Sequence, residues 1–145
     1  MVSNLQGVVS TSGRLNLANT VDTDGNGLPD WWEKEFFNQW TGVNPDGDPD
    51  NDLMPTGAEW LAGTNPTNSS SLLEFSSIAV TANSSITLQW PSVAGKHYRL
   101  LGQTPGMAGF SQLLQTNIAA NPPLNTEVRT NAGAGSLLYR LQVEP

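Results

Sequence analysis

The alternation of apolar and polar residues separates the chain into three regions, residues 1–20, 21–66 and 67–145. From Leu72 onward the period is two, as in strands with one buried face, and Ile86, Leu88 and Trp90 form the clearest example. Gly- and Pro-rich turns separate such runs at intervals of roughly ten residues, which indicates an antiparallel β-sandwich over residues 67–145. We therefore expect a mainly β chain. The predicted strands cover residues 74–80, 85–90, 97–100, 110–115, 126–130 and 137–143.

The period changes to three and four in residues 21–66, where two short helices are predicted. The first begins near Pro29, because proline suits the first helical position, and Gly42 is expected to end it. Its apolar side is expected to contain Trp32, Phe36, Phe37 and Trp40. The second helix begins at Pro55, turns Ala58 and Leu61 inward, and ends at Gly63.

Residues 1–20 are polar and carry two short apolar alternations, at Val8–Val9 and at Leu15–Leu17. This pattern predicts an N-terminal arm with one or two weak strands. Such an arm is suited to adding a strand to the exposed edge of a sandwich, either its own or that of another subunit.

Acidic residues are concentrated in one part of the chain. The net charge is −7, and residues 22–59 hold ten of the thirteen acids but only one base, Lys34. No basic stripe is present to displace counterions from a phosphate backbone, so nucleic acid is not an expected partner. Bound cations are the partners that this charge distribution favours.

The stretch DTDGNGLPDWWE, residues 22–33, matches the calcium-loop pattern D-x-[DN]-x-[DN]-G-x₅-E at every position. Gly27 occupies position six, where the chain must turn sharply. Calcium takes six to eight oxygen ligands at about 2.3–2.6 Å, and this spacing wraps them around one point. The expected ligands are Asp22, Asp24, Asn26, the Leu28 carbonyl, Asp30 and Glu33.

A second loop, DPDNDLMPTGAE at residues 48–59, repeats the pattern with two departures. Leu53 replaces the turn glycine, and positive φ strains a bulky residue. Thr56 replaces the acid at position nine and is a weaker ligand. We therefore expect this second site to bind calcium less tightly than the first. Its expected ligands are Asp48, Asp50, Asp52, Met54 through its carbonyl, and Glu59.

Neither loop has the features of a paired EF-hand. Position eight is proline in both, at Pro29 and Pro55, so neither loop has the backbone N–H through which EF-hand loops pair. No helical pattern precedes either loop. The two units are therefore expected to be loop–helix units.

The acidic stretches DTDGNGLPDWWEKEFF and DPDNDLMPTGAEWLAGTNPTN resemble the calcium-binding, thrombospondin type 3-like repeats of secreted bacterial proteins, of which Verrucomicrobia and Planctomycetes carry many. ITLQWPSVAGKHYRL and LLYRLQV are similar to the small fibronectin type III-like β-sandwich that often ends those chains. The resemblance covers about residues 21–143 and is weak over 101–135, and Leu53 departs from the usual glycine. It implies an extracellular, non-catalytic module that calcium makes rigid.

Other features agree with an extracellular, non-catalytic role. Charged residues make up only 13% of the chain, against about 25% in typical globular proteins, which favours an extracellular β module. There are no cysteines, so a secreted domain needs a staple other than a disulfide, and bound metal is one option. No segment of the sequence resembles a signal peptide or an apolar membrane span. His97 is the only histidine, and no G-x-S-x-G setting appears, so no enzyme activity is expected.

Three functions remain open on the sequence alone. The first is a calcium-stabilised extracellular or cell-surface structural module. The second is a subunit of a self-assembling fibre that uses residues 1–20 for strand addition. The third is a carbohydrate-binding module that stacks sugars on Trp31 and Trp60. The candidate partners are thus a second copy of the chain or an extracellular polysaccharide.

Overall fold

The computed structural model describes residues 21–81, 85–104, 106, 109–130 and 138–144. The chain divides into two compact units, residues 1–43 and 44–145. The second acidic loop therefore belongs to the same unit as the strands, whereas the sequence pattern groups it with the first loop. The predicted N-terminal arm, residues 1–20, lies outside the described residues.

The first unit contains helix α1 (Asp30–Phe37), which begins directly after Pro29, as predicted. Trp32 is buried and packs against the rings of Phe36 and Phe37, with centroid separations of 5.0 and 6.0 Å. Aromatic pairs in this range contribute about 0.5–1.5 kcal/mol beyond their buried area.

Helix α1 ends five residues before the expected stop at Gly42. Asn38 adopts a left-handed conformation with φ of 57°, and its N–H donates to the Lys34 carbonyl. The Lys34 Nζ in turn donates to the Asn38 carbonyl and side-chain oxygens. Because the helix stops here, Trp40 lies beyond it and is 59% exposed. The expectation that Trp40 shares the apolar helix side was wrong.

The second unit begins with the second acidic loop and helix α2 (Thr56–Ala62), which follows Pro55 as predicted. Gly63 ends it with φ of 78°, and a Cβ atom there would lie 3.1 Å from Val93 Cγ1. Both the positive φ and the close approach require glycine. Ala62 is buried, whereas Leu61, expected to point inward, is 46% exposed.

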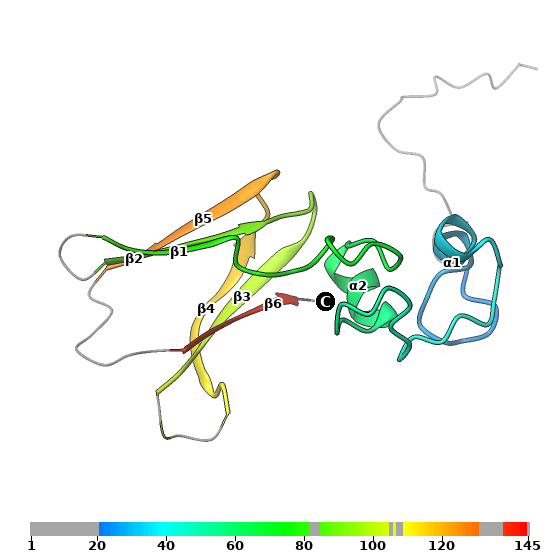
Figure 1. Cartoon of the computed structure of the whole chain (residues 1–145), viewed down its shortest axis with the longest axis horizontal. Helices are drawn as coiled ribbons and strands as arrows, with labels where there is room; N and C mark the ends of the chain where they lie inside the picture. The colour runs from blue at the N-terminus through cyan, green and yellow to red at the C-terminus, as the bar shows by residue number, and fades with distance from the viewer. Residues whose placement is uncertain (1–20, 82–84, 105, 107–108, 131–137, 145) are drawn as a thin grey trace, which may run out of the picture. The chain divides into compact units, whose positions relative to one another are not determined.

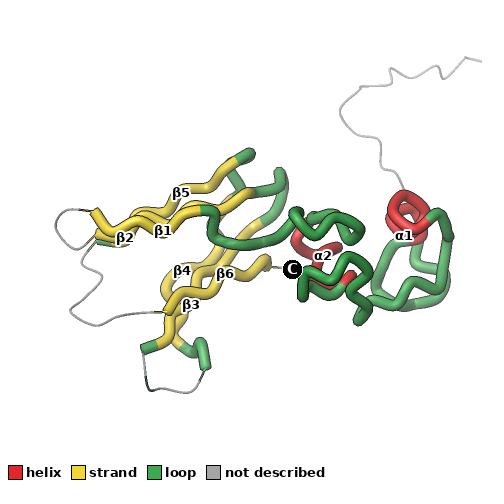
Figure 2. Tube along the Cα trace, in the orientation of Figure 1, coloured by secondary structure: helices red, strands yellow, loops and turns green. Residues whose placement is uncertain are grey.

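Six strands form two antiparallel three-stranded sheets, one ordered β1-β2-β5 and the other β4-β3-β6 (Figures 1 and 2). The chain is therefore mainly β, with two short helices before the sheets, which confirms the predicted fold class. Each strand overlaps one of the predicted segments. They are β1 (Ser77–Thr81), β2 (Ser85–Pro91), β3 (His97–Gln103), β4 (Gln112–Ala119), β5 (Leu124–Arg129) and β6 (Leu138–Glu144).

The core lies between the central strands of the two sheets. Leu88 and Trp90 of β2 and Tyr98 and Leu100 of β3 are fully buried, which confirms the predicted inward alternation. The Trp90 ring meets Tyr98 edge-on at 5.8 Å and Phe75 at 6.1 Å. Tyr98 keeps its hydroxyl satisfied by accepting a hydrogen bond from the Val93 N–H at 3.0 Å. Within the described ranges, no helix is long and apolar enough to cross a membrane.

Candidate metal centre

The two acidic loops, residues 22–33 and 48–59, are closed by the same backbone hydrogen bond. The N–H of position nine donates to the carbonyl just before position one: Asp30 to Val21 and Thr56 to Gly47, both at 2.8 Å. In both loops position eight is the proline that precedes the helix. The sequence repeat is thus a repeat of local structure.

Both loops also turn at the same two positions. Position four has positive φ at Gly25 (71°) and Asn51 (62°), and position six has it at Gly27 (88°) and Leu53 (75°). Glycine adopts this conformation freely and asparagine tolerates it, but leucine is strained. Leu53 is 91% exposed, so little packing compensates for the strain.

The acid at position one holds each turn together. Asp22 accepts hydrogen bonds from the N–H groups of Gly25 and Gly27, at 2.8 and 2.9 Å. Asp48 accepts from those of Asp52 and Leu53, at 3.1 and 3.0 Å. One carboxylate in each loop therefore fixes the backbone that presents the others.

Position five makes the same local contact in both loops. Asn26 Oδ1 accepts from the Leu28 N–H, and Asp52 Oδ1 accepts from the Met54 N–H, each at 2.7 Å. The remaining side-chain atom differs: a neutral amide nitrogen in Asn26 and a carboxylate oxygen in Asp52. Position five therefore gives the first loop a hydrogen-bond donor and the second loop an additional negative charge.

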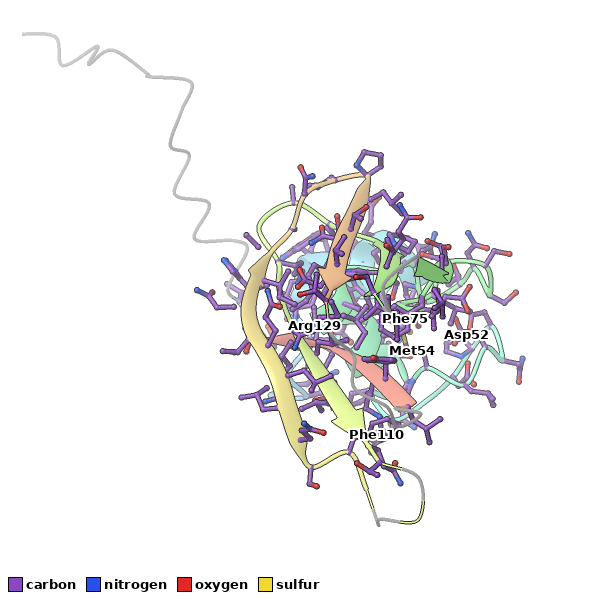
Figure 3. All side chains as sticks on the ribbon, turned by 90° about the vertical axis from the view of Figure 1, so that its left-hand side faces the viewer. Asp52, Met54, Phe75, Phe110 and Arg129 are labelled. Carbon is purple, nitrogen blue, oxygen red and sulfur yellow. The ribbon has the colours of Figure 1, made fainter. Side chains whose placement is uncertain are left out.

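In the second loop three carboxylates converge. Oxygen atoms of Asp48, Asp50 and Asp52 lie within 4.8 Å of one another, and all three side chains are partly buried, so the cluster could hold a metal ion. Asp52 is labelled in Figure 3. No other such acidic group occurs in the part of the chain that the structure describes.

Several buried oxygens of the second loop have no hydrogen-bond partner in the structure. They are both oxygens of Asp50, Oδ2 of Asp52 and Oε2 of Glu59. A buried carboxylate oxygen without a donor is costly unless a cation neutralises it. All the atoms that this loop offers as metal ligands are oxygens, which is what calcium and magnesium require. The residues present therefore fit a hard divalent cation.

The electrostatics of the second loop lead to the same conclusion. Glu59 is fully buried; this burial, and then the negative charge of Asp50, raise its pKa to about 7. Burial and the neighbouring Asp52 raise the pKa of Asp50 as well. The Thr64 hydroxyl donates to Glu59 Oε1 at 3.2 Å, which offsets only part of the cost.

The first loop provides hydrogen-bond donors for most of its acidic oxygens from within the chain. Asp24 accepts from the Gly42 N–H at 2.6 Å, and Glu33 Oε1 accepts from the Val43 N–H at 2.8 Å. The Asn26 amide nitrogen donates to the Val43 carbonyl at 2.9 Å and lies 3.3 Å from oxygens of both Asp24 and Glu33. Asn26 thus places a donor between two carboxylates.

The remaining expected ligands of the first loop are also engaged or buried. Asp30 accepts from the Thr23 hydroxyl and N–H at 2.6 and 2.7 Å, and these bonds lower its pKa. Leu28 is fully buried. Glu33 Oε2 is buried without a hydrogen-bond partner, so this loop too retains one orphaned carboxylate oxygen.

Some of these contacts have no sequence signal. The N–H groups of Gly42 and Val43 and the hydroxyl of Thr23 contribute to the first loop, yet none of these residues belongs to the calcium pattern. Backbone N–H groups are present in almost every residue, so the sequence does not indicate which of them will bond to the loop. Only the folded structure shows this.

The two tryptophans predicted to bind a ligand are both partly buried. The Lys96 Nζ lies 5.6 Å from the centroid of the Trp60 ring and donates to the Trp60 carbonyl at 3.4 Å. Partial burial lowers the pKa of Lys96. Trp31 lies on α1 and also has interactions within the chain.

Comparison with known proteins returns no match. No family model matches the sequence, and neither a curated protein nor a solved structure is significantly similar to it. No family is identified for the chain.

Proposed function

We propose that this chain is a non-catalytic extracellular structural module, of the kind that its resemblance to thrombospondin type 3-like repeats and fibronectin type III-like sandwiches implies, and that calcium stabilises it. The observation that carries the proposal is the group of buried carboxylate oxygens without donors in the second loop. Asp48, Asp50, Asp52 and Glu59 would supply the side-chain oxygens, and Met54 its carbonyl. Calcium is favoured over magnesium because a flexible loop of several carboxylates suits its larger and less regular coordination shell.

The first loop is a second calcium site in this proposal, and we rank it below the second loop. The sequence favours the opposite order because of Leu53. The hydrogen bonds support our order, since the acids of the first loop already have donors. Asn26 is itself engaged, since its Oδ1 accepts from the Leu28 N–H and its amide nitrogen donates to the Val43 carbonyl.

A cation in the second loop would stiffen the base of the sandwich. The loop leads directly into α2, which contacts β6, and Gly63 at the end of α2 packs against Val93 and Lys96. Neutralising the loop would remove the repulsion that opposes this packing. At a hundredfold excess over its dissociation constant, one cation adds about 2.7 kcal/mol to stability. That is a large fraction of the roughly 5–15 kcal/mol typical of a folded domain.

Titration calorimetry with calcium and with magnesium tests the proposal. The whole chain should bind calcium in preference to magnesium, and Asp50→Asn should abolish the tighter of two calcium events. Asp46→Asn is the matched control. Asp46 is an exposed acid just before the same loop, and its substitution removes the same charge. No heat of calcium binding, or an equal loss in both variants, would overturn the proposal.

A further inference from the structure

One side of the β-sandwich is not closed by any strand that the structure describes. Strand β6 pairs with β3 alone among the described residues, and β1 is likewise an edge of its sheet. At the opposite side, β5 and β4 are joined by bonds from Arg129 to Gln115 and from Asn125 to the Ala119 carbonyl, each at 3.0 Å. Because β5 lies beside β4, the edges β1 and β6 occupy the remaining side together.

The apolar core layer continues to this open side. Ile78 and Val80 of β1 pair with Leu88 and Ile86, so they share the core face of their sheet, yet they are 55% and 76% exposed. Paired residues in an antiparallel ladder point to the same face. Apolar side chains on a core face are therefore left in contact with solvent.

Strand β6 repeats this feature in the other sheet. Leu141 pairs with the buried Leu100, and Val143 with the buried Tyr98, but neither Leu141 nor Val143 is fully covered. Seven strands are usual for immunoglobulin-like sandwiches, and the described residues form six. The open side thus has an unpaired strand edge and an incomplete apolar layer at the same place.

A groove of about 260 Å³ runs beside β6 and receives one wall from the second acidic loop and α2. Met54, labelled in Figure 3, lies next to the β6 ribbon at this groove. The groove is mainly apolar, so it suits hydrophobic side chains on a strand laid along β6. Its apolar lining residues include Met54, Ala58, Leu61, Leu73, Leu141 and Val143.

The chain itself contains a segment with matching chemistry. Residues 1–20 lie outside the described structure, and within them Leu15 and Leu17 alternate with polar residues as a half-buried strand requires. The segment contains Arg14 and no acid, whereas the groove adjoins the most acidic part of the second unit. It enters the first unit at Val21, whose carbonyl accepts the Asp30 N–H.

We propose that residues 1–20 of a second copy of the chain add as a strand to the free edge of β6. Leu15 and Leu17 would enter the groove between β6 and α2, and Arg14 would approach the acidic loop. The exchange is head to tail, so each copy leaves one free edge and one free segment, and the assembly extends as a fibre. This inference rests on the strand edge and the groove, and does not require calcium in either loop.

Disulfide trapping in this cysteine-free chain tests the strand position. Gln142 lies on the outer face of β6, where its Oε1 accepts from Arg99, and Asn16 would share that face if Leu15 and Leu17 point inward. An Asn16→Cys chain mixed with a Gln142→Cys or an Arg140→Cys chain should give a disulfide-linked dimer on oxidation. Gln112→Cys, on the opposite edge of the same sheet, is the control and should give little.

Each result of the trapping experiment decides the matter. Dimers formed with the β6 variants and not with the control support the exchange between copies. A chain that carries both Asn16→Cys and Gln142→Cys tests the alternative, in which residues 1–20 add to β6 of the same chain. If this double variant forms an internal disulfide while the mixed single variants form none, the exchange between copies is overturned. Equal dimer yields for the β6 variants and the control, or no disulfide in any mixture, also overturn it.

Sedimentation velocity at high protein concentration provides an independent measurement. The full chain should form large species, and Leu15→Asp combined with Leu17→Asp should abolish them. Ser12→Asp combined with Asn16→Asp adds the same charge at positions that would face away from the groove and should retain most of the association. Repeating the runs with chelator separates the two proposals: association without calcium binding would leave this one standing, and a monomeric full chain under every condition would overturn it.

Discussion

The first and second acidic loops close with the same 2.8 Å backbone bond, turn at the same two positions and lead into helices of similar length. They differ in how their carboxylates are satisfied. In the first loop the Asn26 amide and the N–H groups of residues 42 and 43 supply donors to Asp24 and Glu33, and only Glu33 Oε2 is buried without one. In the second, Asp52 places an oxygen where Asn26 has its amide nitrogen, and buried oxygens are left without donors.

The two loops share the geometry of the calcium pattern, but their carboxylate oxygens differ in their hydrogen-bond partners. The pattern determines where the oxygens stand on the loop, because its spacing and its turns are local. The need for a cation depends on which donors reach those oxygens. That is decided by the residue at position five and by the chain that follows each helix.

The largest expected difference between the loops concerns the two buried glutamates at position twelve. Glu59→Gln should remove most of the calcium-dependent stabilisation of the second unit, about 2.7 kcal/mol at a hundredfold excess of calcium. Glu33→Gln, the matched change in the first loop, should leave most of it in place. Denaturant unfolding with calcium and with chelator measures both. The reverse outcome would make the first loop the principal site.

Exchanging the residue at position five should convert one loop into the other. Asn26→Asp removes the bond to the Val43 carbonyl and adds a charge between Asp24 and Glu33, so the calcium-free chain should lose about 1–3 kcal/mol of unfolding free energy. Its calcium dependence should increase. Asp52→Asn should have the opposite effect on the second loop. An unchanged calcium dependence in both variants would contradict the comparison.

A further difference should appear in the pH dependence of the calcium-free chain. The folded pKa of Glu59 is raised to about 7, mainly by burial, so the stability this group contributes is present at low pH and is lost as the pH rises from about 4.5 through 7. Asp50 shifts in the same direction. The pKa of Asp30 is lowered, so its contribution is lost only as the pH falls below the ordinary range of aspartate.

Thermal unfolding in chelator should therefore give a melting temperature that falls between pH 5 and pH 7. Glu59→Gln should flatten this slope, and saturating calcium should reverse it because protons and calcium compete for the same oxygens. A melting temperature that rises with pH in chelator would show that Glu59 does not carry the effect.

The smallest expected effect concerns the turn at position six. Leu53→Gly should raise the unfolding free energy by up to about 1 kcal/mol, because it relieves positive φ at a residue that packs against little. Gly27→Ala should lower it by about the same amount in the first loop. Asn51→Gly is the control and should change little, since asparagine tolerates this conformation. Urea unfolding of the three variants would detect the order.

Much of the local structure follows from the sequence alone. Period-two alternation located all six described strands, and Leu88, Trp90, Tyr98 and Leu100 were identifiable as inward positions. Pro29 and Pro55 marked the starts of both helices. These features depend on neighbouring residues in the sequence, so a short sequence pattern is sufficient to predict them.

Tertiary structure decided the rest. The sheet orders β1-β2-β5 and β4-β3-β6, the open side at β6 and the exposure of Trp40 arise from contacts between distant segments or from a competing cap. The same is true of the donors to the first loop, because Val43 lies 17 residues beyond Asn26. The acidic residues are concentrated by the sequence, whereas the fold selects which of their oxygens lack a hydrogen-bond partner, because such partners come from residues that are close in space and not only from neighbours along the chain.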